Sequence, residues 1–199
     1  MRFYLAKGNK KMAQAKTLTP AELEQVLAYI ASRKFALRNR VMLLTGFLSG
    51  MRVGEISSLK VGDVMNEDGK VKAEIRLTAE QTKGRHPRTV FVSQKLQDEM
   101  QHYLNLRKPV KATDPLFVTA GRKGFTANGM AQHFYWLFKG AGIDGASSHS
   151  LRRSFLTSLA SKGISIHVLA SLAGHRNLQV TMRYLYSSDE MKRNAVELI

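Results

Sequence analysis

Apolar residues recur at helical spacing over most of the chain, and this pattern predicts a mainly α-helical protein. The first helix should begin at residues 19–22, where Thr19 and Glu22 form a capping box and Pro20 takes the first helical position. The apolar period carries this helix to Ile30. Further helices are predicted over residues 38–48, 52–59, 94–104, 127–138, 151–162, 165–172 and 188–198.

The pattern changes after a turn signal at residues 66–69. Apolar side chains then alternate with polar ones, as in a half-buried strand, at Val71, Ala73, Ile75 and Leu77. A basic loop, residues 82–88, leads to a second predicted strand over residues 89–92. We therefore expect an α+β fold that is mainly α-helical, with a small antiparallel sheet inserted early in one domain.

The net charge of the chain indicates which class of molecule it binds. The 199 residues include 31 Lys and Arg against 15 Asp and Glu, a formal net charge of +16. A folded domain with this excess usually meets a polyanion, which makes nucleic acid the favoured partner. A ribosomal or architectural protein would carry the same charge, so charge alone does not predict catalysis.

Cysteine is absent from the sequence. Its absence excludes disulfides, thiolate metal sites and a cysteine nucleophile, and it fits a reducing cytoplasm, where we expect the protein to act. The sequence has neither an apolar run of about 20 residues nor an N-terminal signal segment, so we expect no membrane partner.

Arg52 lies in a setting that suits an anion. Gly50 should end one helix, and Arg52 would then begin the next, where free backbone N–H groups favour negative charge. Glu55, one turn further on, can hold the guanidinium in place. A surface Arg–Glu pair at this spacing is common, so the segment by itself also fits an ordinary ion pair.

Two later segments add imidazoles, a guanidinium and a phenol. His149 and Arg152 lie three residues apart and therefore share one helical face. Gly174 predicts a tight corner that presents His175, and Tyr184 follows nine residues after that histidine. Taken singly, these residues also fit exposed helix caps and an amphipathic core tyrosine.

Together the segments resemble the tyrosine recombinase, or phage integrase, family. The resemblance rests on G-x-R-x-x-E around Arg52, Lys83 on a β-hairpin turn, H-x-L-R at residues 149–152, L-x-G-H ending at His175, and the tyrosine nine residues later. It runs from about residue 18 to residue 186 in the family's order.

The resemblance implies a site-specific recombinase that integrates, excises or inverts DNA. Tyr184 would attack the scissile phosphate, giving a 3′-phosphotyrosyl link and a free 5′-hydroxyl. Arg52 and Arg152 would bind the non-bridging oxygens and stabilise the transition state. Because the bond energy stays in the phosphotyrosine, the resemblance implies neither ATP nor a metal cofactor.

The remaining roles also come from the resemblance. Lys83 would protonate the leaving 5′ oxygen, His149 would act as general acid and base on the tyrosine proton, and His175 would donate a hydrogen bond to the phosphate. Glu55 would support the first arginine. The chain departs from many members by carrying Arg153 where they have histidine, and Tyr186 competes with Tyr184 for the nucleophile's role.

The expected organisation is a flexible basic arm over residues 1–17 and a catalytic domain over residues 18–199. Residues 187–199 would form a C-terminal helix that docks on an adjacent protomer or packs on its own domain. Most members also have an N-terminal core-binding domain, for which the residues before 18 are too few. We therefore expect a naturally short recombinase or a fragment of a longer one.

The expected partners are double-stranded DNA, further copies of the chain as a dimer or tetramer on DNA, and accessory DNA-bending proteins. Two other functions stay open from the sequence. A type IB topoisomerase would relax DNA with the same tyrosine chemistry, and a DNA-binding regulator would use the basic surface without catalysis.

Overall fold

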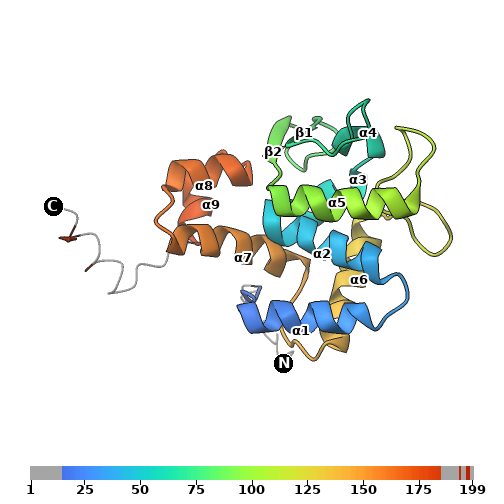
Figure 1. Cartoon of the computed structure of the whole chain (residues 1–199). Helices are drawn as coiled ribbons and strands as arrows, with labels where there is room; N and C mark the ends of the chain where they lie inside the picture. Colours follow the sequence, from blue (N-terminus) through green and yellow to red (C-terminus); the bar gives the residue numbers. More distant parts are fainter. Residues whose placement is uncertain (1–14, 185–192, 194–195, 198–199) are drawn as a thin grey trace, which may run out of the picture.

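The computed structural model describes residues 15–184, 193 and 196–197, and in this part of the chain nine helices accompany a two-stranded sheet (Figure 1). The elements are α1 (Pro20–Ala31), α2 (Ala36–Ser49), α3 (Val53–Ser58), α4 (Val61–Val64), β1 (Glu74–Leu77), β2 (Arg88–Phe91), α5 (Gln94–Arg107), α6 (Ala127–Gly140), α7 (Ser148–Ser161), α8 (Ile166–Ala173) and α9 (Leu178–Met182). Within these described residues, none of the helices has the length and apolar character needed to cross a membrane.

Helix α2 lies at the centre of the domain because it is apolar around most of its circumference. Residues 41–46 are all buried, and α1, α5 and α7 pack around them. Gly46 lets α7 come close, since a Cβ atom at this position would lie 2.8 Å from Leu151 Cδ1. Gly50 then ends the helix in the left-handed conformation, with φ of 64°, as its sequence position predicts.

The predicted start of α1 is confirmed. The Thr19 Oγ1 accepts a hydrogen bond from the Glu22 backbone N–H, the Glu22 carboxylate accepts one from the Thr19 N–H, and Pro20 is the first helical residue. Immediately before this helix, Leu18 is buried and donates its backbone N–H to Ser154 Oγ at 2.8 Å. The chain therefore enters the domain along α7, beside the segment that carries His149 and Arg152.

The small sheet is an antiparallel hairpin in which Ile75 pairs with Val90. The first strand is shorter than predicted: β1 begins at Glu74, while Val71 forms an isolated bridge with Met65. Ala73 is exposed, so its predicted place on the buried face is wrong. The reason is that the chain bends at Ala73 between these two pairings, which interrupts the alternation.

Helices α8 and α9 lie to one side of the rest of the domain, at the far end of α7, which itself packs against α2 (Figure 1). Four buried residues on α7 and α8 form a small apolar cluster separate from the main core: Leu156, Ala160, Leu169 and Ala173. Phe155, Leu159 and Tyr184 pack against it, so Tyr184, two residues after α9, is held by this cluster. We refer to α8, α9 and the residues up to 184 as the C-terminal lobe.

Two helices were not predicted, α4 and α9, and both span one turn or little more. In α9 the Asn177 side chain accepts a hydrogen bond from the Gln179 N–H and caps the start. The helix predicted over residues 188–198 lies almost wholly outside the described residues.

Candidate active site

One groove brings together all six residues that the sequence singled out. It has a volume of about 950 Å³, and its lining includes Arg52, Lys83, His149, Arg152, His175 and Tyr184. Further cationic side chains line it too: Lys16, Arg153, Arg176 and Arg183. Among the described residues that form its wall there is no carboxylate, so the groove is suited to a polyanion.

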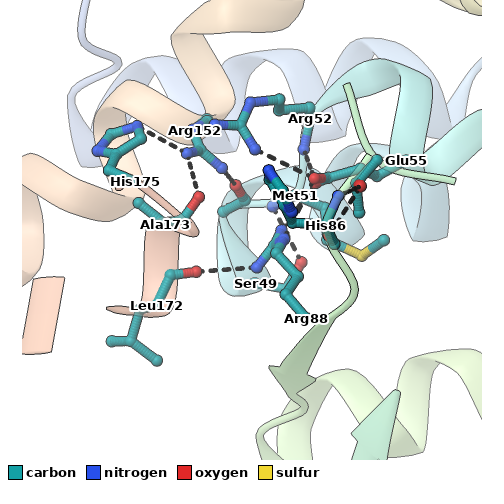
Figure 2. Close-up of polar contacts among 12 residues, drawn as sticks. Ser49, Met51, Arg52, Glu55, His86, Arg88, Arg152, Leu172, Ala173 and His175 are labelled. Atoms are coloured by element: carbon teal, nitrogen blue, oxygen red, sulfur yellow. Dashed lines mark hydrogen bonds and ion pairs between the residues drawn. The ribbon is translucent and has the colours of Figure 1, made fainter. Parts of the chain in front are cut away.

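Arg52 is held at the start of α3 by Glu55, as predicted. The Arg52 backbone N–H donates to Glu55 Oε2 at 2.7 Å, and its Nη1 donates to Oε1 at 3.1 Å. The Arg52 side chain is 29% exposed and that of Glu55 is 1% exposed. The buried carboxylate therefore holds Arg52 from inside the fold (Figure 2), while Arg52 lines the groove.

Arg88 is a member of this cluster that the sequence prediction missed. It begins β2, and its Nε and Nη2 donate to Glu55 Oε1 and Oε2 at 3.1 and 2.7 Å (Figure 2). The sequence shows it only as the last residue of a basic loop. No local pattern distinguishes it from Arg85, which is exposed in the same loop.

The Glu55 carboxylate is ionised despite its burial. Burial by itself would raise its pKa, but the hydrogen bonds and charge of Arg88, together with the Arg52 N–H and guanidinium, outweigh burial and lower the pKa. One buried negative charge thus lies between two cations, and it holds both of them in place.

Arg152 lies deeper than Arg52 and is fixed by the backbone of two segments. Its Nη1 donates to the Gly50 carbonyl at 2.7 Å, and its Nη2 donates to the Ala173 carbonyl at 2.5 Å. Burial, followed by repulsion from Arg52, lowers the pKa of Arg152 to about 10, so the guanidinium stays charged at neutral pH. Both carbonyls belong to residues beside helix ends, where acceptors are left free by the helix itself.

His175 lies between Arg152 and Thr181. Its Nε2 is 2.9 Å from Arg152 Nη2, and its Nδ1 is 2.9 Å from Thr181 Oγ1. A guanidinium can only donate, so His175 Nε2 accepts from Arg152, and the Nδ1–H donates a hydrogen bond to Thr181 Oγ1. Burial, then the charges of Arg152, Arg52 and Arg88, lowers the pKa of His175 to about 4, which leaves the imidazole neutral at pH 7.

The predicted corner before His175 is confirmed. Gly174 has φ of 61° and caps α8, with its N–H bonded to carbonyls of that helix. A Cβ atom on Gly174 would lie 2.6 Å from Arg88 Cδ. The glycine therefore permits both the turn that presents the imidazole and the close approach of Arg88.

Tyr184 follows α9 and lies beside His175. The two rings are stacked, with centroids 6.1 Å apart and an interplanar angle of 14°. Tyr184 is half-buried and lines the same groove as Arg152. Tyr186, the competing residue, lies outside the described residues.

Lys83 and His149 are both exposed at the groove. His149 is in the first turn of α7, and Lys83 is in the loop that joins β1 to β2. Arg153, where the family often has histidine, donates from Nε to Thr17 Oγ1 at 3.0 Å and so ties residue 17 to α7. Across residues 15–184, 193 and 196–197, no three His, Asp or Glu side chains gather as a metal site.

Comparison with known proteins identifies the family. Residues 16–191 match the model of the phage integrase family. The chain belongs to this family. The predicted family and fold class are confirmed.

Individual relatives agree with the family match. The tyrosine recombinase XerA of Pyrococcus furiosus is 30% identical over 187 residues, which cover 92% of this chain and 61% of that protein. The crystal structure of a XerA recombinase superposes with a TM-score of 0.74 at 25% identity, covering 92% of this chain and 64% of the other. A XerH site-specific recombinase bound to its difH substrate superposes with a TM-score of 0.68 at 25% identity. The match covers 90% of this chain and 53% of the XerH chain.

These coverages also show how much of each relative the chain matches. It spans about three fifths of the length of the curated recombinases that it matches.

Proposed function

We propose that this chain cuts and rejoins DNA strands at specific sites through a 3′-phosphotyrosyl intermediate on Tyr184. The observation that supports this most is the single basic groove that gathers residues from positions 52, 83, 149, 152, 175 and 184. A protein that only bound DNA would need the charge, but it would not need a phenol beside two guanidiniums and two imidazoles.

The two arginines would bind the scissile phosphate. Their described contacts occupy part of each guanidinium: Arg52 uses one of its five N–H donors on Glu55, and Arg152 uses three on Gly50, Ala173 and His175. The remaining donors would contact the non-bridging oxygens. Because both cations are fixed before DNA arrives, they need no reorganisation as negative charge develops in the transition state.

The strand-cleavage step would then proceed without an external energy source. The Tyr184 oxygen attacks phosphorus and the bond to the 5′ oxygen breaks, while His149 takes the phenolic proton and Lys83 supplies one to the leaving oxygen. The reverse reaction, with a 5′-hydroxyl from a partner strand, rejoins the DNA. Lys83, on the exposed loop, would move onto the DNA to reach this oxygen.

His175 would gain a second proton when the chain binds DNA. Its Nε2 accepts from Arg152 in the described state, so it cannot also donate to a phosphate. A phosphate in the groove adds negative charge, which raises the pKa of a neighbouring imidazole and favours a protonated form with both nitrogens as donors. We propose that this form donates the hydrogen bond to the phosphate.

The proposed partners are double-stranded DNA and further copies of the chain, as a dimer or tetramer on DNA. The structure of a XerH site-specific recombinase bound to its difH substrate supports the first. Accessory DNA-bending proteins would assist, and the cytoplasm, where such DNA lies, is the proposed location. Residues 187–199 would dock on a neighbouring protomer, so deleting residues after 188 should reduce the pairing of two sites more than it reduces single-strand cleavage.

A covalent trapping assay tests the proposed chemistry. Wild type, Tyr184→Phe and Tyr186→Phe would each be mixed with a pool of nicked duplexes that includes DNA flanking the native gene. Protein–DNA adducts that survive detergent would be counted and their DNA sequenced. A nick beside the cleavage site lets the short strand diffuse away, so the intermediate accumulates.

Each outcome has a definite meaning. Adducts with wild type and Tyr186→Phe, but not with Tyr184→Phe, would support Tyr184 as the nucleophile and would name the target site. Loss with Tyr186→Phe alone would move the nucleophile by two residues. DNA binding without an adduct from any of the three proteins would argue against strand cleavage by this chain.

A further inference from the structure

Arg88 joins three segments that are far apart in the sequence. Its Nε and Nη2 donate to the Glu55 carboxylate on α3, and its Nη1 donates to the Leu172 carbonyl at 3.0 Å on α8 (Figure 2). Its own backbone begins β2, directly after the loop that carries Lys83. The side chain is only 10% exposed, so these contacts are largely shielded from water.

The Glu55 carboxylate is fully used by four donors. Arg52 supplies two of them, its backbone N–H and Nη1, and Arg88 supplies the other two. A carboxylate has about four lone-pair directions, so this arrangement leaves none empty. As a result Arg52 needs to give Glu55 only one side-chain N–H, and the rest of its guanidinium is available to the groove.

We propose that Arg88 is a positioning residue for strand cleavage, which keeps Arg52 directed at the scissile phosphate by occupying the other half of Glu55. Without Arg88, two lone pairs of a buried carboxylate would lack donors, which is costly. Arg52 is the nearest remaining cation, and it would turn inward to bind the carboxylate through both of its terminal nitrogens. The inference rests on the proposed function, because it concerns the phosphate that Arg52 would bind.

A purely structural ion pair is the competing explanation, and it predicts a different pattern. If Arg88 only stabilised the fold, its loss would lower the unfolding free energy without a specific effect on cleavage by folded protein. If Arg88 acts through Glu55, its effect on cleavage should depend on the Glu55 charge. A neutral Gln at position 55 would no longer attract Arg52 inward.

The test is a double-mutant cycle of Arg88→Gln and Glu55→Gln. Single-turnover cleavage would be measured at saturating concentration of the nicked duplex recovered in the trapping assay, below the unfolding temperature of every variant. Arg85→Gln is the matched control, since it removes the same charge from the exposed part of the same loop.

We expect Arg88→Gln to reduce the cleavage rate about 100-fold in the wild-type background, the scale of a misplaced catalytic group, and less than about threefold in the Glu55→Gln background. The cleavage rate of Arg88→Lys should lie between those of wild type and Arg88→Gln, because an ammonium cannot reproduce the two parallel hydrogen bonds of a guanidinium. Equal losses in both backgrounds, or a loss no larger than that of Arg85→Gln, would overturn the proposal.

A second readout separates this inference from the proposed cleavage chemistry. Inorganic sulfate is a tetrahedral oxoanion that can bind the paired arginines whether or not Tyr184 is a nucleophile. The Tm of each protein would be measured as a function of sulfate concentration. A weaker sulfate response in Arg88→Gln than in Arg85→Gln would support the positioning role even if no variant cleaved DNA, and identical responses would count against it.

Discussion

Replacing Gly174 with alanine tests the junction of Arg88 and the C-terminal lobe directly. Two strains would result: alanine would have to adopt φ of 61°, and its Cβ would lie 2.6 Å from Arg88 Cδ. Gly163 supplies a matched control in the neighbouring turn. It has φ of 78°, and nothing lies within 4 Å of the position its Cβ would take.

The expected magnitudes follow from these two geometries. Alanine in the left-handed region costs roughly 1 kcal/mol at either position. At position 174 the Arg88 side chain must also move, and losing one charge-assisted hydrogen bond costs about 2 kcal/mol more. We expect Gly174→Ala to lower the unfolding free energy by about 3 kcal/mol and Gly163→Ala by about 1 kcal/mol. For a domain of this size these values correspond to about 9 and 3 °C in Tm.

Urea unfolding followed by circular dichroism would measure the unfolding free energy of both variants. Replacing glycine with alanine affects the unfolded chain equally at the two positions, so this contribution cancels in the comparison. The same pair would then be made in an Arg88→Ala background. The difference between positions 174 and 163 should nearly vanish there, because no side chain remains to be displaced. Equal losses in the wild-type background would refute the argument, as would a difference that persists without Arg88.

Three further expectations concern acid, burial and salt. Burial, followed by the charge of Arg38, lowers the pKa of His133 on α6 to about 4, the same value as for His175, against 6.5 ordinarily. The unfolded chain therefore binds more protons between pH 4 and 6.5. The unfolding free energy in urea should therefore fall as pH is lowered from about 6.5 to about 4, and His133→Gln should flatten this slope. Glu55→Gln should lower the unfolding free energy by about 3 kcal/mol, because it leaves the largely buried Arg88 and the partly exposed Arg52 without their anion; a loss below about 1 kcal/mol in calorimetry would contradict this. Arg52→Gln should reduce the slope of log affinity for duplex DNA against log salt by about one, and an unchanged slope in fluorescence titrations would show that Arg52 makes no phosphate contact.

Local sequence signals predicted the parts of this structure that are locally determined. The capping box at Thr19 and the glycines at positions 50 and 174 each act through their own φ and ψ angles and nearby hydrogen bonds. Their effect is therefore visible in a few consecutive residues. The motif residues were found in the same way, since each motif fixes its spacing along one helix or turn.

What the sequence did not reveal depends on contacts across the fold. Arg88 and Arg85 are the same residue type in one short loop, and only tertiary packing places the first against Glu55. Ala73 left the predicted buried face because Val71 pairs with a different partner from β1. Which nitrogen of His175 carries the proton likewise depends on Arg152, which is 23 residues away in the sequence.

The separate apolar cluster of the C-terminal lobe has a consequence for motion. That cluster contains four buried residues on α7 and α8. The lobe is further joined to the domain by hydrogen bonds from Arg88 and Arg152 to carbonyls at the C-terminal end of α8, and from Arg152 to His175. Such a unit can open at a lower free energy than the whole domain, and its amide hydrogens should exchange with solvent sooner than those of α2. His175 and Tyr184 would leave together when it opens, while Arg52 and Glu55 stay in place. The fraction of time that the site is assembled is then an equilibrium property of the chain, and a binding partner that contributes a few kcal/mol to the closed lobe would change that fraction many-fold.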